Sequence, residues 1–293
     1  MSSFGIQKDL ETYITLRSYL QERGIRIVTI ASNADICSKV NIYHFARYVP
    51  LSMEGVRTVD YDNRGANRIV RALIVKKKKS IPRRAFFNQT TIQMKPRPNP
   101  DNDEINIKVF KNRSLQITGC KDMEDFYDVV TRLIEILKNG VTATFQDGTE
   151  HRIAFCKNPD ELEIKDVMIR LIVSCFNLDY KIDRRHLARL LKHNHSLYSK
   201  DQEIGYIKFK NDPNGKHSCV NIKYRYDDDT TISIFVFHTG SVIITAAKTL
   251  PQIISAYEYV SKILVRYREQ VRVIDFDPTI MASIIKNYRK VHG

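Results

Sequence analysis

Two long segments of this chain repeat one another, and this repeat constrains the fold more than any other feature. The first begins at Ile107 and reads IKVFKNRSLQITGCKDMEDFYDVVTRLIEIL; the second begins at Ile234 and reads IFVFHTGSVIITAAKTLPQIISAYEYVSKIL, and the two align without gaps at an offset of 127 residues. Upstream, KVNIYHFAR at Lys39 matches KIDRRHLAR at Lys181 at an offset of 142. Because self-similarity in a fixed order marks a repeated structural unit, the sequence predicts two copies of one unit.

Each copy is predicted to contain a short apolar strand, a helix, several alternating strands and a long helix. The first strands are IRIVTIAS at Ile25 and MIRLIVSCFNL at Met168, and Asn41 and Asp183 are the predicted N-caps of the helices that follow. The long helix of the first copy has apolar residues three and four apart: Phe126, Val129, Val130, Leu133, Ile136 and Leu137. The expected fold class is therefore α+β, with helices on one face of an antiparallel sheet.

The composition favours a polyanionic partner. The 293 residues include 47 Lys and Arg against 33 Asp and Glu, a formal net charge of +14. Such a charge is most often typical of proteins that bind nucleic acid, and sometimes of proteins that bind an anionic membrane surface. No apolar run is long enough to span a membrane, and five dispersed cysteines form no zinc motif. Without a P-loop, nucleophile elbow or dinucleotide fingerprint, we expect no enzyme activity, no cofactor, no metal and no small-molecule substrate.

The sheet face opposite the helices is the predicted binding surface. Side chains on this face alternate with the core set, and they include Phe110 and Thr118 in the first copy and Phe237 and Thr245 in the second. We expect this face to be apolar and free of helices. Such a patch on a soluble basic protein usually binds a partner.

On these motifs the chain resembles the TATA-box-binding protein family. The motifs that support the resemblance are F-K-N-R-S-L-Q-I-T-G-C-K, F-H-T-G-S-V-I-I-T-A-A-K, KVNIYHFA and KIDRRHLA. The resemblance extends from about Ile25 to Val271. It implies a saddle in which two repeats form one curved antiparallel sheet with helices on the convex face. The low overall identity and the long repeats suggest a divergent member from a viral or protist lineage, such as a large DNA virus.

The resemblance also implies a division of the chain. The expected parts are an N-terminal helical extension (1–24), a first repeat (25–145) with a basic insertion at about 55–84, a linker (146–166), a second repeat (167–271) and a C-terminal helical extension (272–293).

In the family, phenylalanines enter the DNA minor groove at both ends of the saddle and kink the duplex. The resemblance assigns this wedge role to Phe110 and Phe237, and to Phe87 or its neighbour Phe86. The equivalent position in the second repeat is His217, which departs from the family. A lone strand phenylalanine is more often a core residue, so the wedge assignment depends on the repeat.

The resemblance assigns further groove contacts near the centre of the sheet. Thr118 and Thr245 match groove-facing threonines, and Val173 and Ile243 keep the apolar character of the face. The family places an asparagine on the first strand of each repeat, where this chain has Thr29 and Leu171. Asn33, four residues after Thr29, is a possible substitute. Strict TATA preference is therefore a weaker expectation than minor-groove binding.

The segment RGANRIVRALIVKKKKSIPRR is basic and has no acidic residue. It is either a solvated loop or flank of inserted elements, or a set of phosphate contacts beside the groove. The second interpretation assigns phosphate contacts to Lys76, Lys77, Lys78, Lys79, Arg83 and Arg84.

The resemblance implies a transcription initiation factor that binds AT-rich promoter DNA, bends it and recruits a factor like the B-type initiation factor (TFIIB) and RNA polymerase. The alternative is a protein-interaction scaffold whose DNA binding is weak or non-specific. A nucleic-acid enzyme is the third class, because related half-saddle units occur as appendages of some DNA-repair glycosylases and ribonucleases, and it is the least favoured. A cellular protein would act in the nucleus, and a viral one in the host nucleus, a cytoplasmic viral factory or the virion.

Overall fold

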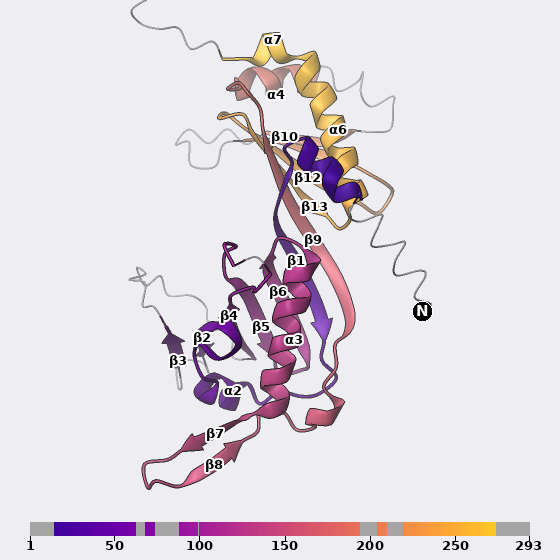
Figure 1. Ribbon diagram of the computed structural model, residues 1–293. Coiled ribbons are helices and arrows are strands. Elements are labelled where there is room, and N and C mark those ends of the chain that lie inside the picture. Colours follow the sequence, from indigo (N-terminus) through magenta and orange to yellow (C-terminus); the bar gives the residue numbers. More distant parts are fainter. Residues whose placement is uncertain are drawn as a thin grey trace, which may run out of the picture. The chain divides into compact units, whose positions relative to one another are not determined.

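The computed structural model describes residues 15–62, 68–73, 88–98, 100–193, 204–209 and 219–273, with only the backbone of 204–209. The described chain forms two compact units. Unit A comprises Ile27–Ser174, and unit B comprises Met1–Arg26 together with Cys175–Gly293. One long strand, β9 (Lys165–Asn177), begins in unit A and ends in unit B. Figure 1 shows the elements of both units and labels most of them.

Unit A is built on an antiparallel sheet with the strand order β1-β6-β5-β4-β2-β3. Its strands are β1 (Arg26–Asp35), β2 (Val56–Asp62), β3 (Arg68–Ala72), β4 (Gln89–Met94), β5 (Ile105–Phe110) and β6 (Ser114–Cys120). Its helical elements are α2 (Ile42–Tyr48), η1 (Met53–Gly55), α3 (Met123–Asn139) and η2 (Pro159–Glu161). A separate hairpin, β7 (Val141–Thr144) and β8 (Glu150–Ile153), follows α3. Helix α3 packs on β6, and α2 packs on β2 and β4 (Figure 1).

Unit B repeats this plan. Its strands lie in the order β10-β11-β12-β13, with β13 next to β9. They are β10 (Ile204–Phe209), β11 (Cys219–Arg225), β12 (Thr231–Phe237) and β13 (Ser241–Ala247). Helix α4 (Arg184–His193) packs on β10 and β11, α6 (Leu250–Arg266) packs on β12 and β13, and α7 (Arg268–Val271) follows α6. Residues 15–22 are helical, and Tyr19 of this segment donates a hydrogen bond to Glu258 of α6 at 2.8 Å.

The two central hairpins have the same register, residue for residue. In β5 and β6, Lys108 lies opposite Gln116; in β12 and β13, Phe235 lies opposite Ile243, and each residue is 127 positions later. Helices α3 and α6 are both 17 residues long and begin 127 residues apart. The gap-free alignment of the two segments therefore corresponds to matching strands, turns and helices.

Local side-chain chemistry fixes where the helices begin. Asp122 accepts a hydrogen bond from the Asp125 backbone N–H at 2.8 Å and caps α3. Thr249 and Gln252 form a reciprocal capping box at the start of α6. As predicted, Asn41 and Asp183 accept from backbone N–H groups at the starts of α2 and α4, at 3.0 Å in both cases. These caps satisfy donors that the first helical turn leaves free.

The apolar side of each sheet faces the helices. The six apolar residues predicted for the core face of α3 are no more than 1% exposed, which confirms the periodicity argument. They pack over sheet residues such as Ile107 and Ile117, which are fully buried. The equivalent residues of unit B, Ile234 and Ile244, are also fully buried. The predicted α+β class, with antiparallel strands and helices on one sheet face, is thus confirmed in each unit.

The structure adds elements that the sequence prediction did not place. The predicted linker, 146–166, contains β8 and η2 and belongs to unit A. The predicted insertion, about 55–84, contains β2 and β3. Residues 274–293, most of the predicted C-terminal extension, lie outside the described residues.

Candidate nucleic-acid interface

The candidate interface is, in each unit, the sheet face that points away from the helices of that unit, which we call its open face. On β5, β6, β11 and β13, buried residues alternate with half-buried ones. In β5 and β6 the buried set includes Ile107 and Ile117, whereas Phe110 and Thr118 are half-buried. In unit B, Phe237 and Thr245 are half-buried in the same way. Neither phenylalanine belongs to the fully buried core, so both remain available to a partner.

The same turn holds Phe110 and Phe237 at the ends of their strands. Arg113 and Gly240 each donate a backbone hydrogen bond to the carbonyl of the phenylalanine three residues earlier, at 3.3 and 3.1 Å. Both have left-handed backbones, with φ of 82° for Arg113 and 86° for Gly240. The carbonyl of each turn residue also accepts from a residue that follows β1 or β9, Ile36 or Leu178, at 3.1 and 2.9 Å. The backbone therefore fixes both phenylalanines in equivalent positions.

Gly240 is the tighter of the two turn positions, and we expect Gly240→Ala to lower the free energy of unfolding by about 2–4 kcal/mol. A Cβ atom at Gly240 would lie 2.4 Å from the Tyr180 carbonyl oxygen, in a backbone conformation that disfavours alanine. Urea unfolding followed by circular dichroism measures this change. The matched control is Arg113→Gly, which relieves a positive φ and should leave stability unchanged or slightly higher. Equal losses in both variants would contradict this argument.

The threonines predicted to lie near the centre occupy the open face. Thr118 pairs with Asn106 on one side and Ala31 on the other, and Thr245 pairs with Ser233. No hydrogen bond of the Thr118 or Thr245 hydroxyl to another described residue is found.

The two polar side chains predicted on the first strand are already partly engaged. The Thr29 hydroxyl accepts a hydrogen bond from the Gly119 backbone N–H at 3.0 Å, at an irregularity in the β1–β6 pairing. The Asn33 amide, in the orientation that suits its neighbours, accepts from the guanidinium of Arg170 at 3.0 and 3.3 Å. Asn33 pairs with Gln116 and is half-buried on the open face.

The remaining predicted contacts fall into two groups. Val173 and Ile243 are half-buried, as expected for the open face, and Leu171 is half-buried as well. The others lie outside the described residues: Phe86, Phe87, His217, Lys76, Lys77, Lys78, Lys79, Arg83 and Arg84.

The open face of unit B has an apolar pair on β12 and β13 that unit A lacks, but Asn221 and Lys223 on β11 beside this pair are polar, as is most of the β4–β6 region of unit A. This corrects the expectation of an apolar face throughout. In unit B, Phe235 and Phe237 lie on β12 and Ile243 lies opposite Phe235. Burial raises the pKa of the Cys219 thiol, opposite Phe237, and so favours its neutral form. The equivalents of Phe235 and Ile243 in unit A are Lys108 and Gln116. The expectation was wrong because it rested on Phe110 and Thr118, which the repeat preserves. Lys108 and Gln116, which lie between these two residues on the sheet, differ from their equivalents in unit B.

Part of the basic segment has a structural role. Residues Arg68–Ala72 form the edge strand β3. Within it, Arg71 donates to the backbone carbonyls of Ala46, Arg47 and Val49 at 3.1, 2.7 and 2.7 Å. These carbonyls lie at the end of α2, so Arg71 satisfies acceptors that a helix terminus leaves free.

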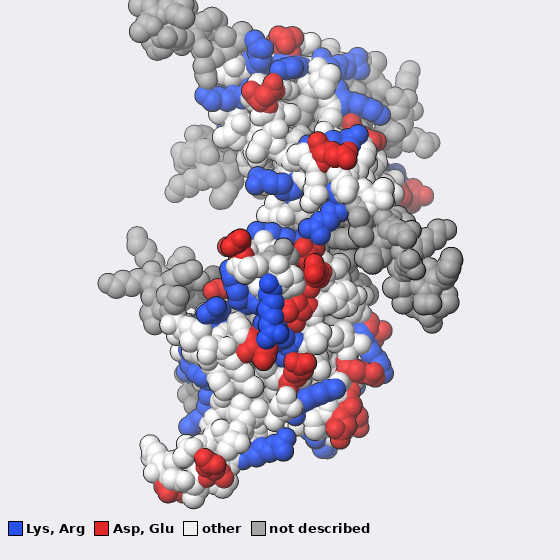
Figure 2. Space-filling model, in the orientation of Figure 1, with Lys and Arg blue, Asp and Glu red and all other residues white. Residues whose placement is uncertain are grey.

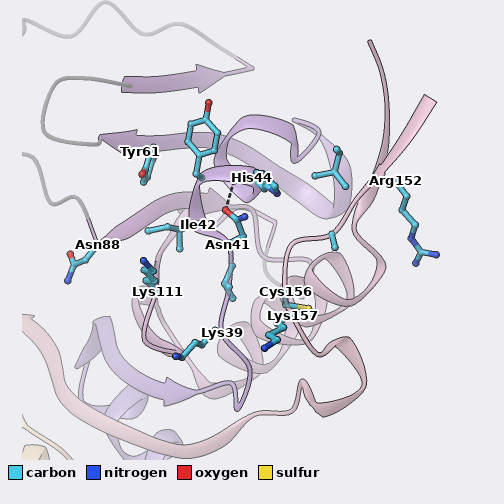
Figure 3. Close-up of a pocket in the computed structure, with 14 residues that line it drawn as sticks. Lys39, Asn41, Ile42, His44, Tyr61, Asn88, Lys111, Arg152, Cys156 and Lys157 are labelled. Carbon is cyan, nitrogen blue, oxygen red and sulfur yellow. Dashed lines mark hydrogen bonds between the residues drawn. The ribbon is translucent and has the colours of Figure 1, made fainter. Parts of the chain in front are cut away.

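A cationic cleft of about 850 Å³ lies in unit A, beside the turn that follows Phe110 (Figure 3). Sequence reasoning missed it because its basic residues come from distant segments: Lys39 before α2, Lys111 after β5, and Arg152 and Lys157 in and after β8. The backbone N–H of Lys157 donates to the Lys39 carbonyl at 3.4 Å, which brings two of these residues together.

No carboxylate is among the described residues that line the cleft. Within the described part of the chain, the ammonium groups of Lys39, Lys111 and Lys157 have no hydrogen bond or ion pair. Burial raises the pKa of Tyr61, which also lines the cleft, so this tyrosine is neutral at physiological pH. The cleft can therefore accept an anion such as a phosphate group.

The helix side of unit A carries mixed charge. Around α3, the face in Figure 2 shows Lys and Arg side chains interspersed with Asp and Glu. Charges of both signs at close range screen one another, so the basic excess of the chain is not concentrated on this visible face.

Across the described ranges, no group of three or more His, Cys, Asp or Glu side chains is placed to hold a metal ion. None of the described helices is both long and apolar enough to cross a membrane.

Comparisons with known proteins place the chain in a family. No protein-family model matches it. A protein of Acanthamoeba polyphaga mimivirus, described as TATA-box-binding protein-like, is 45% identical over 284 residues, which cover 96% of this chain and 76% of the relative. The TATA-box-binding protein of Pyrodictium occultum is 24% identical over 163 residues, which cover 56% of this chain and 62% of that protein. A solved structure of Methanococcus jannaschii TBP gives a TM-score of 0.47 at 14% identity, over 83% of this chain and 98% of that one.

The predicted family resemblance is thereby confirmed. Identity of 45% over almost the whole chain extends through both repeats and the segments between them. The chain therefore belongs to the TATA-box-binding protein-like family.

Proposed function

We propose that the protein is a non-catalytic promoter-binding factor that contacts the DNA minor groove through its open faces and bends the duplex. One observation carries the proposal: in a member of the TATA-box-binding protein-like family, two hairpins of identical register each end in a half-buried phenylalanine, Phe110 or Phe237, held by the same turn. Such a side chain can enter a base step, and the unstacking cost is offset by the larger contact that a bent duplex makes.

The phosphate contacts in this proposal come from the cationic cleft as well as from the basic segment. Lys111 follows Phe110 directly, so its ammonium group lies near the position where a kinked backbone would pass. Lys39 and Lys157 line the same cleft. Each phosphate that such a residue neutralises releases counterions, which makes binding salt-dependent.

Promoter binding would place the protein in transcription initiation. We propose that the DNA-bound protein recruits a factor like the B-type initiation factor and, through it, RNA polymerase. Family membership supports this role in transcription. The helix side of each unit is the surface left for such partners, because the open faces are occupied by DNA in this proposal.

A specific observation favours a second candidate, the protein-interaction scaffold. Lys108 and Gln116 put polar groups on the open face of unit A where unit B has Phe235 and Ile243. A face that has lost apolar contacts with the groove floor would bind DNA weakly or without sequence preference. The unit could then serve as a docking surface for another protein.

Fluorescence-detected bending of end-labelled duplexes tests the proposal. We expect an AT-rich TATA duplex to bind more tightly than a GC-matched control, with a large fall in end-to-end distance. A salt series should show log affinity falling by about 0.9 per phosphate contact for each unit of log salt concentration. Equal, steeply salt-dependent binding to both duplexes without bending would reject the promoter-bending function and favour the scaffold.

A further inference from the structure

The two hairpins present different chemistry at the same structural positions. Phe235 and Ile243 are Cα partners on the open face of unit B, and Lys108 and Gln116 are Cα partners on the open face of unit A. All four side chains are half-buried. Because the pairing is identical, the difference lies in the side chains and not in a shift of strand register.

The polar character of unit A extends across neighbouring strands. One row of Cα partners runs from Asn33 through Gln116 and Lys108 to Thr91. The adjacent row runs through Thr118, Asn106 and Gln93. No interaction of the Lys108, Gln116 or Asn106 side chain with any other described residue is found. Half-buried polar groups of this kind need partners, which water or a ligand supplies.

We infer that the two units read their halves of the DNA site differently: unit A accepts G·C pairs, and unit B rejects them. This inference rests on the proposed minor-groove function. It names Gln116 and Lys108 as the residues that permit G·C under unit A, and Phe235 and Ile243 as the residues that exclude it under unit B.

The chemistry of the groove floor gives the reason. A·T and T·A pairs present only acceptors there, whereas G·C adds the amino group of guanine, a donor. The Gln116 amide can accept from that amino group, and it can also donate to the acceptors that every base pair presents. The Lys108 ammonium can donate to the same acceptors. Phe235 and Ile243 offer the guanine amino group no acceptor, so a guanine that lies on this pair loses water without gaining a partner from it. The acceptor of unit B next to this pair is the amide of Asn221, the Cα partner of Phe235 on β11.

This difference would also orient the protein. A protein built from two equivalent units can bind a symmetric AT-rich site in either direction. A site with G·C pairs in one half binds well in one direction only, with unit A over the mixed half and unit B over the A·T half.

The test compares duplexes that carry a G·C pair in neither half, one half or the other. Parallel duplexes carry inosine·C, which lacks the minor-groove amino group. With the full-length protein, we expect G·C in one half to weaken binding about tenfold or more, inosine·C to restore it, and G·C in the other half to cost less than threefold. Equal losses in both halves, or losses that inosine·C does not relieve, would overturn the inference.

Reciprocal exchanges assign each half to a unit. Lys108→Phe with Gln116→Ile should create a tenfold G·C penalty in the tolerant half, and Phe235→Lys with Ile243→Gln should remove the penalty from the other. Thermal unfolding and bending of the all-A·T duplex identify the exchange variants that fold and bind. If an exchange variant does not fold, the comparison of G·C with inosine·C duplexes on the wild-type protein still tests the inference. If the exchange variants fold and bend DNA but the loss of affinity caused by G·C stays in the same half, the inference is wrong while the proposed function stands. Absence of bending and of A·T preference in the wild type would refute the proposed function itself.

Discussion

Phe237→Ala is expected to lower affinity for a bendable AT-rich duplex about 10- to 100-fold and to remove most of the bend at one end of the site. The magnitude corresponds to the ~1.5–3 kcal/mol that burial of a phenylalanine side chain contributes. Without the wedge, the cost of unstacking a base step is no longer offset. The end-to-end distance of a labelled duplex should then be intermediate between straight and fully bent, because Phe110 still acts at the other end.

The same substitution should change folding stability little. Phe237 is half-buried on the open face, and the turn that holds it is formed by backbone groups of Phe237 and Gly240 that alanine retains. Phe126 provides the opposite pattern, because it lies on the core side of α3 and is fully buried. Phe126→Ala should cost about 3–5 kcal/mol of stability while any folded protein still bends DNA. If Phe237→Ala loses thermal stability and bends DNA normally, Phe237 is a core residue and the wedge assignment is wrong.

Phe110→Ala should have a similar effect at the other end of the site. Its turn residue, Arg113, donates to the Phe110 carbonyl as Gly240 does to that of Phe237. A double variant should leave the duplex nearly straight. Bending that survives in the double variant would shift the wedge role to other residues, such as the phenylalanines at positions 86 and 87.

The strands and helices of the two repeated segments were predictable from the sequence because local signals and the repeat agreed, whereas β2, β3, β7 and β8 were not placed. The alternation in INIKVF and ISIFVF marks one buried face, and the shared offset fixes the register of both hairpins. Helix starts followed from the capping residues Asn41 and Asp183. These features depend on residues that are close in sequence, so a single chain reveals them.

The chemistry of the open face was less predictable. The repeat drew attention to residues that the two copies share, whereas Lys108 and Gln116 are informative because they differ from Phe235 and Ile243. The cationic cleft was missed for another reason: Lys39, Lys111 and Lys157 are brought together by tertiary contacts between segments that are more than 40 residues apart. No local sequence pattern indicates that these lysines lie close together in the fold.

The sequence analysis also did not predict that a charged side chain, Arg132, is buried in unit A. Arg132 lies on the core side of α3 and is 3% exposed, although its neighbours on that side are apolar. The equivalent position in α6 is Tyr259, whose ring stacks on Tyr224 at 4.7 Å. The repeat therefore indicates a buried position but not the polar partners that Arg132 requires.

Arg132→Met is expected to lower the free energy of unfolding of unit A by about 3–5 kcal/mol, the cost usual when one partner of a buried ion pair is removed. The guanidinium bonds to Asp128 through two nitrogens and donates to the backbone carbonyls of Glu54 and Lys95, the latter at 2.8 Å. It thus joins α3 to η1 and to the end of β4. Methionine fills a similar volume but leaves a mostly buried carboxylate and two carbonyls without their donor.

Hydrogen exchange measured by mass spectrometry locates the loss, because the two units can open separately. Protection should fall in α3, η1 and β4, and much less in α6 and β12. Arg97→Ala is the matched control: Arg97 also pairs with a residue of this region, Glu54, but its side chain is 61% exposed. An exposed pair contributes roughly 0–1 kcal/mol, so this variant should stay close to the wild type. If Arg132→Met proves neutral, the apolar packing of α3 alone would hold η1 and β4 in place, and the guanidinium would be dispensable for folding.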